Sequence, residues 1–153
     1  MNALIAKSNK LSGWLGRQSI DILRISLGLV FLAFGVLKFF PGASPAEALV
    51  IRTIDTLTLG VISGSTALLL TAVMECFIGI TLITGKLLRT GLLVLGFSLV
   101  GIMSPLVLFF GDLFPGTPTL EAQYVFKDIV LAAAGLVIAA KALASAPLRR
   151  RIA

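Results

Sequence analysis

The sequence contains no histidine and a single cysteine, Cys76, among its 153 residues. Without imidazole the chain lacks a common ligand of haem and catalytic metals, and one thiol forms neither a CxxC dithiol nor an intrachain disulfide. We therefore expect no metal, haem or disulfide to be held by this chain alone. Redox chemistry would need a partner protein or a bound organic cofactor.

Charged residues are scarce as well. Only 13% of the residues are charged and 58% are hydrophobic, whereas soluble domains have about 25% and about 45–50%. These proportions exclude an ordinary soluble domain and indicate an integral membrane protein. The net charge of +6 does not favour nucleic acid as a partner, because the basic residues flank apolar stretches, where they orient a protein in a lipid bilayer.

Four apolar stretches predict membrane-spanning helices, at about 22–40, 65–85, 91–110 and 124–140. Between the first two, Ser44-Pro45-Ala46-Glu47 has the pattern of a capping box, so an amphipathic helix is expected to begin at Ser44 or Pro45. The predicted fold is all-α: a four-helix transmembrane bundle with this extra helix on its outer face. The predicted divisions are a basic N-terminal segment (1–21), a four-span membrane domain (22–144) and a basic tail (145–153).

Smaller features refine this picture. The segment before residue 20 is either a short helix on the membrane surface or a frayed tail. In the third span, Pro105 lacks the N–H that would bond to the carbonyl of Gly101, which predicts a kink or a local pocket. Residues 111–121 are rich in turn formers and predict a loop.

The basic residues predict the orientation. If the N-terminus is cytoplasmic, ten of the thirteen Lys and Arg residues lie on the cytoplasmic side, and only Lys38, Arg52 and Lys127 lie on the other. This positive-inside pattern places both termini in the cytoplasm.

Glu75 stands near the centre of the second apolar stretch, roughly 15 Å below the membrane surface at ~1.5 Å per residue. A carboxylate at that depth must be protonated, paired, hydrogen-bonded or wetted, so it marks a candidate functional site. We predict that it faces the bundle interior and meets Lys127 or Lys38, with Lys127 reaching it from above. The alternative is a protonated packing residue bonded to Thr71.

The first span carries a second signal. The 4-3-4-3 spacing puts five residues on one helix face, which small glycines turn towards other helices: Arg24, Gly28, Phe31, Gly35 and Lys38. Lys38 is therefore either part of the site or a snorkelling residue at the outer interface.

Several motifs carry a resemblance to a known family: LKFFPG (37–42), SPAE (44–47), E-x-x-IG (75–79) and PTLE-x-QY-x-x-K (118–127). With them, the chain resembles the DoxX-like family of bacterial integral membrane proteins over most of residues 24–140. The resemblance implies a four-helix bundle in the bacterial cytoplasmic (inner) membrane. It also implies a link to redox physiology, because the family takes its name from a subunit associated with archaeal thiosulfate:quinone oxidoreduction and some members are tied to oxidative-stress complexes.

The resemblance also implies site residues, because the family's recurring polar positions fall on Lys38, Glu47, Arg52, Glu75, Glu121, Gln123, Tyr124 and Lys127, with Asp128 where asparagine is expected. We predict a ligand site formed by Glu75, Lys38, Lys127, Tyr124 and Gln123. The predicted polar network at the outer face consists of Glu47, Arg52, Glu121 and Asp128.

Three functions fit these patterns. The first is an accessory subunit that binds a quinone-like lipophile or a lipid and acts in a respiratory or redox complex, with any enzymatic role belonging to a quinone-linked oxidoreductase assembly. The second is a small transporter with Glu75 as coupling acid, although four spans without repeats are few for alternating access. The third is a structural subunit. The expected partners are the lipid bilayer, other subunits or a second copy of the chain.

Overall fold

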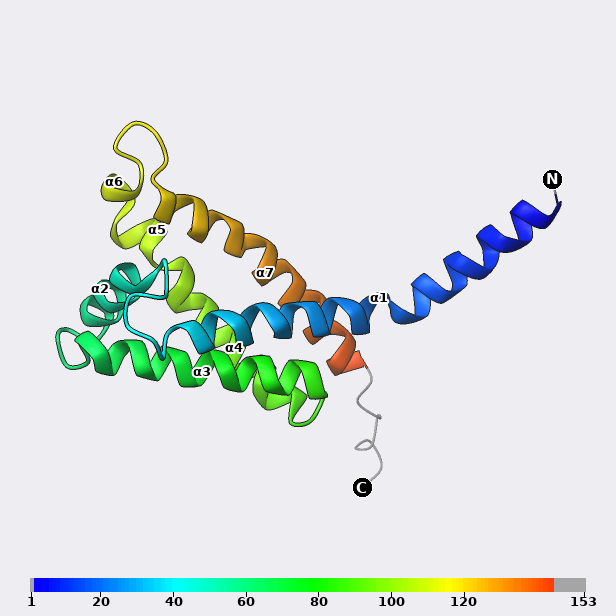
Figure 1. The fold of residues 1–153 in the computed structure, drawn as a ribbon, viewed down its shortest axis with the longest axis horizontal. Coiled ribbons are helices and arrows are strands. Elements are labelled where there is room, and N and C mark those ends of the chain that lie inside the picture. The colour runs from blue at the N-terminus through cyan, green and yellow to red at the C-terminus, as the bar shows by residue number, and fades with distance from the viewer. Residues whose placement is uncertain (1, 145–153) are drawn as a thin grey trace, which may run out of the picture.

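Helices are the only regular secondary structure in the part of the chain that the computed structural model describes, residues 2–144, with side chains from residue 12 onward. Met1 and the predicted basic tail, 145–153, lie outside the described residues. The seven helices are α1 (Asn2–Leu37), α2 (Glu47–Leu57), α3 (Gly64–Thr84), α4 (Leu88–Met103), α5 (Pro105–Leu108), α6 (Phe110–Leu113) and α7 (Leu120–Ala144). Figure 1 shows α1, α3, α4 and α7 as the long rods and α2, α5 and α6 gathered at one end.

Three helical segments are long and apolar enough to cross a membrane: Ser12–Leu37, Gly64–Thr84 and Leu88–Leu108. They confirm an all-α membrane fold and correspond to the first three predicted spans. The fourth span stays a prediction. In α7 the uncharged stretch, 129–140, is only about 18 Å long at ~1.5 Å per residue, and lysines stand on both sides of it.

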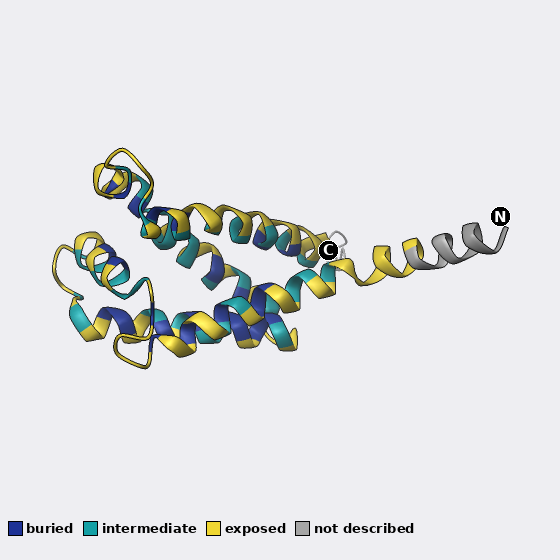
Figure 2. Cartoon of the chain, turned by 45° about the horizontal axis from the view of Figure 1, so that its top comes forward, coloured by how far each residue is buried: buried dark blue, intermediate teal, exposed yellow. Residues whose placement is uncertain are grey.

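Apolar side chains cover much of the outer surface of these helices. Leu93, Phe97 and Val100 on α4 are each more than 70% exposed, and Figure 2 shows exposed positions along every long helix. A soluble domain rarely leaves so continuous an apolar surface in water. The exposed side chains are those expected to face lipid.

The closest packing in the bundle is between α1 and α3, and glycines make it possible. A Cβ at Gly79 would lie 2.7 Å from the backbone nitrogen of Leu32 and 2.8 Å from the carbonyl oxygen of Gly28. A Cβ at Gly35 would lie 2.9 Å from the backbone nitrogen of Cys76. The predicted inward face of the first span is confirmed, because Gly28, Gly35 and their companions Phe31 and Lys38 are buried.

The main core lies where α1 and α3 meet α4 and α7, and it contains Leu27, Phe31, Ile78, Leu82, Leu95 and Ile138. A second, smaller core joins α2 to the segments around α5, α6 and the start of α7, through Leu49, Phe109, Leu113, Ala122 and Val125. We call the end that holds α2, α5 and α6 the loop end, and the opposite end, with the α3–α4 turn, the basic end. In Figure 1, α7 begins apart from α1 at the loop end and converges on it towards the basic end.

The N-terminal segment differs from both sequence predictions. It is neither a separate surface helix nor a frayed tail, because α1 is one continuous helix of 36 residues. No proline interrupts residues 2–37, so no residue forces the helix to end before the first span. Its first part projects away from the bundle (Figure 1).

The predicted capping box is not formed. The helix begins at Glu47, with Ala46 at the N-cap and no side-chain cap, and the buried Ser44 hydroxyl has no partner in the described part of the chain. The Glu47 carboxylate instead accepts a hydrogen bond from the backbone nitrogen of Gly42, at 2.8 Å. The turn at Gly42, with φ of +76°, presents this amide to the carboxylate, so α2 starts later than predicted.

The kink at Pro105 is confirmed. Helix α4 ends at Met103 and α5 begins at Pro105, and the Ser104 hydroxyl donates to the freed carbonyl of Gly101 at 2.7 Å. The predicted loop after it begins later than expected, since α6 adds one helical turn. Thr119 then caps α7, because its hydroxyl accepts from the backbone nitrogen of Ala122 at 3.1 Å.

Candidate functional site

A buried ion pair joins α3 to the residue that follows α1. Lys38 Nζ lies 2.6 Å from Glu75 Oε2, and the two residues are only 5% and 6% exposed. Removing both charges from water costs several kcal/mol per ion, which the pair offsets only in good geometry. A charged pair with Glu75 inside a candidate span and Lys38 directly after another is therefore the strongest functional signal in the described part of the chain.

The close contact between α1 and α3 at Gly28, Gly35 and Gly79, which we call the glycine seam, explains why this pair forms. Lys38 comes directly after α1, and its backbone nitrogen still bonds to the carbonyl of Gly35 at 3.2 Å. Because Gly35 has no side chain, α1 approaches α3 at Glu75 and Cys76, which brings the lysine within reach of the carboxylate. The ammonium also lies 3.5 Å from the carbonyl oxygen of Phe34 and 5.9 Å from the centre of its ring.

Of the two partners predicted for Glu75, Lys38 forms the ion pair and Lys127 does not. Lys127 is exposed, and its ammonium lies 4.1 Å from the centre of the Tyr124 ring on its own helix. Helix α7 packs mainly against α1 and α4 and stands apart at the loop end, so its lysine does not reach α3. The alternative hydrogen bond from Thr71 to Glu75 is also absent, since the Thr71 hydroxyl donates to Ala67 at 2.9 Å.

Asp128 lies nearer to the pair than its sequence position suggests. It is half-buried and close enough to Lys127, Glu75 and Lys38 to interact electrostatically with each of them. The half-buried Asp128 therefore lies beside the buried Lys38–Glu75 pair, with Lys127 at the surface.

The predicted outer-face network is divided into separate contacts. Arg52 forms an ion pair with Asp112 at 2.7 Å, and its guanidinium lies 3.9 Å from the centre of the Phe109 ring. Both partners of this ion pair are more than half exposed. Glu47 bonds to Gly42, as described above.

The predicted residues at the start of α7 remain apart from Glu75. Glu121 and Tyr124 are half-buried and Gln123 is exposed. Their role in ligand binding stays a prediction.

A cavity of about 240 Å³ opens beside the ion pair at the loop end. Lys38 and Glu47 provide its charged groups, and the other lining residues are Phe39, Pro41, Ile51, Ser65, Leu68 and Leu69. Sequence reasoning missed Ile51, Ser65 and Leu68, because ordinary apolar and small residues give no signal until α2 is folded onto α3. The cavity makes Lys38 a lining residue as well as the partner of Glu75.

A family model described as DoxX matches residues 19–111, more than half of the chain. The chain belongs to the DoxX family. No curated protein and no solved structure matches it.

The DoxX match includes most of the candidate site. The matched region, residues 19–111, contains Lys38, Glu75 and all the lining residues of the cavity. It also contains Glu47 and Arg52. The predicted site residues on α7 follow the matched region: Glu121, Gln123, Tyr124, Lys127 and Asp128. The ion pair and its cavity are thus built from the DoxX region alone.

Proposed function

We propose that this DoxX protein is an accessory membrane subunit that binds a quinone-like lipophile at the loop end, beside the Lys38–Glu75 ion pair. The observation that carries the proposal is that Lys38 belongs both to the buried ion pair and to the wall of the adjacent cavity. A lysine in that place offers hydrogen bonds to a ligand in surroundings that are otherwise mainly apolar.

The chemistry of the cavity suits the head group of a quinone. An ammonium has three donors; the strong bond to Glu75 uses one and the longer bond to the Phe34 carbonyl a second, so the third is available to a quinone carbonyl. Apolar walls from Phe39, Ile51 and Leu68 would pack against the ring. Sites for whole drug-sized ligands measure about 300–1,000 Å³, so a cavity of about 240 Å³ suits a head group whose tail remains among the lipids.

The proposed role is binding rather than electron transfer. With no histidine and one cysteine, the chain offers few side chains for ligating a redox centre. We propose that electrons pass through another subunit of a membrane redox complex, and that the DoxX subunit holds or delivers the lipophile.

Equilibrium binding of a short-chain ubiquinone to the purified protein in detergent tests this proposal. We expect Ser65→Phe, which fills the cavity without touching the ion pair, to abolish saturable binding, and Lys38→Met to weaken it strongly. Arg52→Gln is the matched control at the same end, since it removes a cation outside the cavity, and it should bind like the unmodified protein. Equal binding by the Ser65→Phe variant, or none above empty micelles by the unmodified protein, would overturn the proposal.

We further propose that α7 is a fourth span and that both termini lie in the cytoplasm of a bacterial inner membrane. Four basic residues lie around one cavity at the basic end: Arg17, Arg24, Arg89 and Lys141. This grouping supports the orientation through the positive-inside rule. In a Cys76→Ala background, an impermeant maleimide added outside cells should label Thr117→Cys and spare Lys86→Cys. The reverse pattern would contradict the orientation.

A further inference from the structure

A second cavity lies at the basic end, away from the ion pair. It measures about 650 Å³ and lies between α1, the start of α4 and the last turns of α7. Four basic residues line it, Arg17, Arg24, Arg89 and Lys141, with Asp21 as the single acid. The three arginines alone outnumber the one acid in the lining.

The basic residues differ in how far they are already engaged. Arg24 donates hydrogen bonds to the carbonyls of Leu82 and Ile83 at the end of α3 and pairs with Asp21. Arg17 and Arg89 are exposed, and neither has an ion pair or a side-chain hydrogen bond within the described residues. Asp21 thus balances Arg24, and the charges of Arg17 and Arg89 are left uncompensated.

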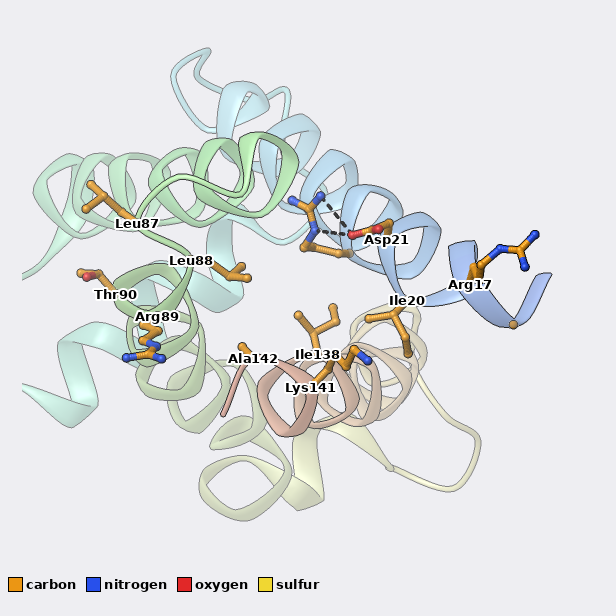
Figure 3. A pocket seen from close by; sticks show the side chains of 12 residues that line it. Arg17, Ile20, Asp21, Leu87, Leu88, Arg89, Thr90, Ile138, Lys141 and Ala142 are labelled. Carbon is orange, nitrogen blue, oxygen red and sulfur yellow. Dashed lines mark hydrogen bonds and ion pairs between the residues drawn. The ribbon is translucent and has the colours of Figure 1, made fainter. Parts of the chain in front are cut away.

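The arrangement of the lining is amphipathic. Figure 3 shows Ile20, Leu88 and Ile138 pointing into the space between the helices, while Arg17 and Arg89 stand on opposite sides of it. The walls are therefore apolar and the rim is cationic. The first turn of α4 also faces this space, and its N-cap, Leu87, provides no side-chain cap, so its free N–H groups add to the positive field.

We infer that this cavity binds the phosphate of an anionic phospholipid, with Arg17 and Arg89 closing on the phosphate oxygens. Two features favour a lipid over a free anion. The cavity lies at the end of candidate spans, at the level expected for head groups, and its apolar walls suit the glycerol and upper acyl methylenes. Basic pockets between transmembrane helices are a known form of lipid head-group site, and arginine matches phosphate oxygens through paired N–H donors.

Native mass spectrometry of the full-length protein, exchanged into phosphatidylcholine nanodiscs with and without phosphatidylglycerol, tests this inference. We expect the unmodified protein to retain phosphatidylglycerol in preference to phosphatidylcholine. Arg89→Gln and Arg17→Gln should each reduce that retention, and the double variant should lower it roughly tenfold, as expected for loss of charge-assisted bonds. Both side chains are exposed, and circular dichroism should show unchanged helicity.

Lys86→Gln is the matched control. Lys86 lies at the same end, three residues before Arg89, but does not line the cavity, so its loss should change retention less than about twofold. If Lys86→Gln and Arg89→Gln reduce retention equally, the attraction is diffuse and the cavity is not a site. If inorganic phosphate at millimolar concentration displaces the lipid completely, the site binds free anions and the assignment to a lipid is wrong.

Discussion

The two ends of the α1–α3 pair hold their cations in opposite ways. At the loop end, Lys38 is buried against one carboxylate, and the two charges cancel. At the basic end, Arg24 bonds to the carbonyls at the end of α3, and further cations surround it without an equal number of acids. Charge at the loop end therefore fixes geometry and offers hydrogen bonds, whereas charge at the basic end produces a field that attracts anions.

Breaking the buried Lys38–Glu75 ion pair at the loop end should have the largest effect on stability. Glu75→Leu removes the ion-pair partner of the buried Lys38 ammonium and should lower the free energy of unfolding by about 3–5 kcal/mol. The double variant Lys38→Met/Glu75→Leu should recover most of that loss, because it removes both charges. Unfolding in mixed micelles, titrated with sodium dodecyl sulfate, measures both values.

The exposed pair at the same end is the control for this experiment. Arg52→Gln breaks the Arg52–Asp112 ion pair, whose partners are more than half exposed, and should cost less than about 1 kcal/mol. If Glu75→Leu costs no more than Arg52→Gln, burial does not distinguish the two pairs and the account of the loop end fails.

Substitutions in the glycine seam, which connects the two ends, should have the next largest effect on stability. A methyl group at Gly79 meets the backbone of α1, so Gly79→Ala should destabilise by about 1–3 kcal/mol and also reduce quinone binding by moving Lys38. Gly96→Ala is the control, because a Cβ there meets no atom within 4 Å. It should stabilise α4 by about 0.5–1 kcal/mol. Equal destabilisation by both substitutions would show that the seam is not closely packed.

Substitutions of the cations at the basic end should cause the smallest loss of stability. Arg24→Met removes the hydrogen bonds at the end of α3 and a cation favourably placed near the negative end of that helix, so we expect a loss of about 1–2 kcal/mol. Arg17→Met should change stability by less than about 0.5 kcal/mol, since Arg17 only lines the cavity. A loss from Arg17→Met as large as that from Arg24→Met would mean that the cavity is held together by its cations.

Much of this comparison follows from the sequence. Apolar runs locate the first three spans, the glycine spacing identifies the inward face of α1, and Pro105 marks the kink between α4 and α5. Each of these features depends on local chemistry. The spacing also includes Lys38 among the candidate partners of Glu75.

The rest depends on distances between helices that sequence patterns do not contain. Lys38 rather than Lys127 pairs with Glu75 because Gly35 brings α1 close while α7 begins apart. The Glu47 carboxylate binds Gly42 instead of closing a capping box because a turn supplies a competing amide. Both cavities are spaces between elements, so neither has a motif of its own.

Photolabelling tests the central claim most directly, namely that the cavity beside Lys38 binds a quinone-like lipophile. The protein in liposomes would be irradiated with an azido-quinone analogue and the modified peptides mapped by mass spectrometry. The account predicts labels on residues 38–51 and 65–69, suppressed by excess unlabelled quinone and absent in the Ser65→Phe variant. Labels spread over lipid-facing residues such as Phe97 and Val100, and unaffected by competitor, would contradict it.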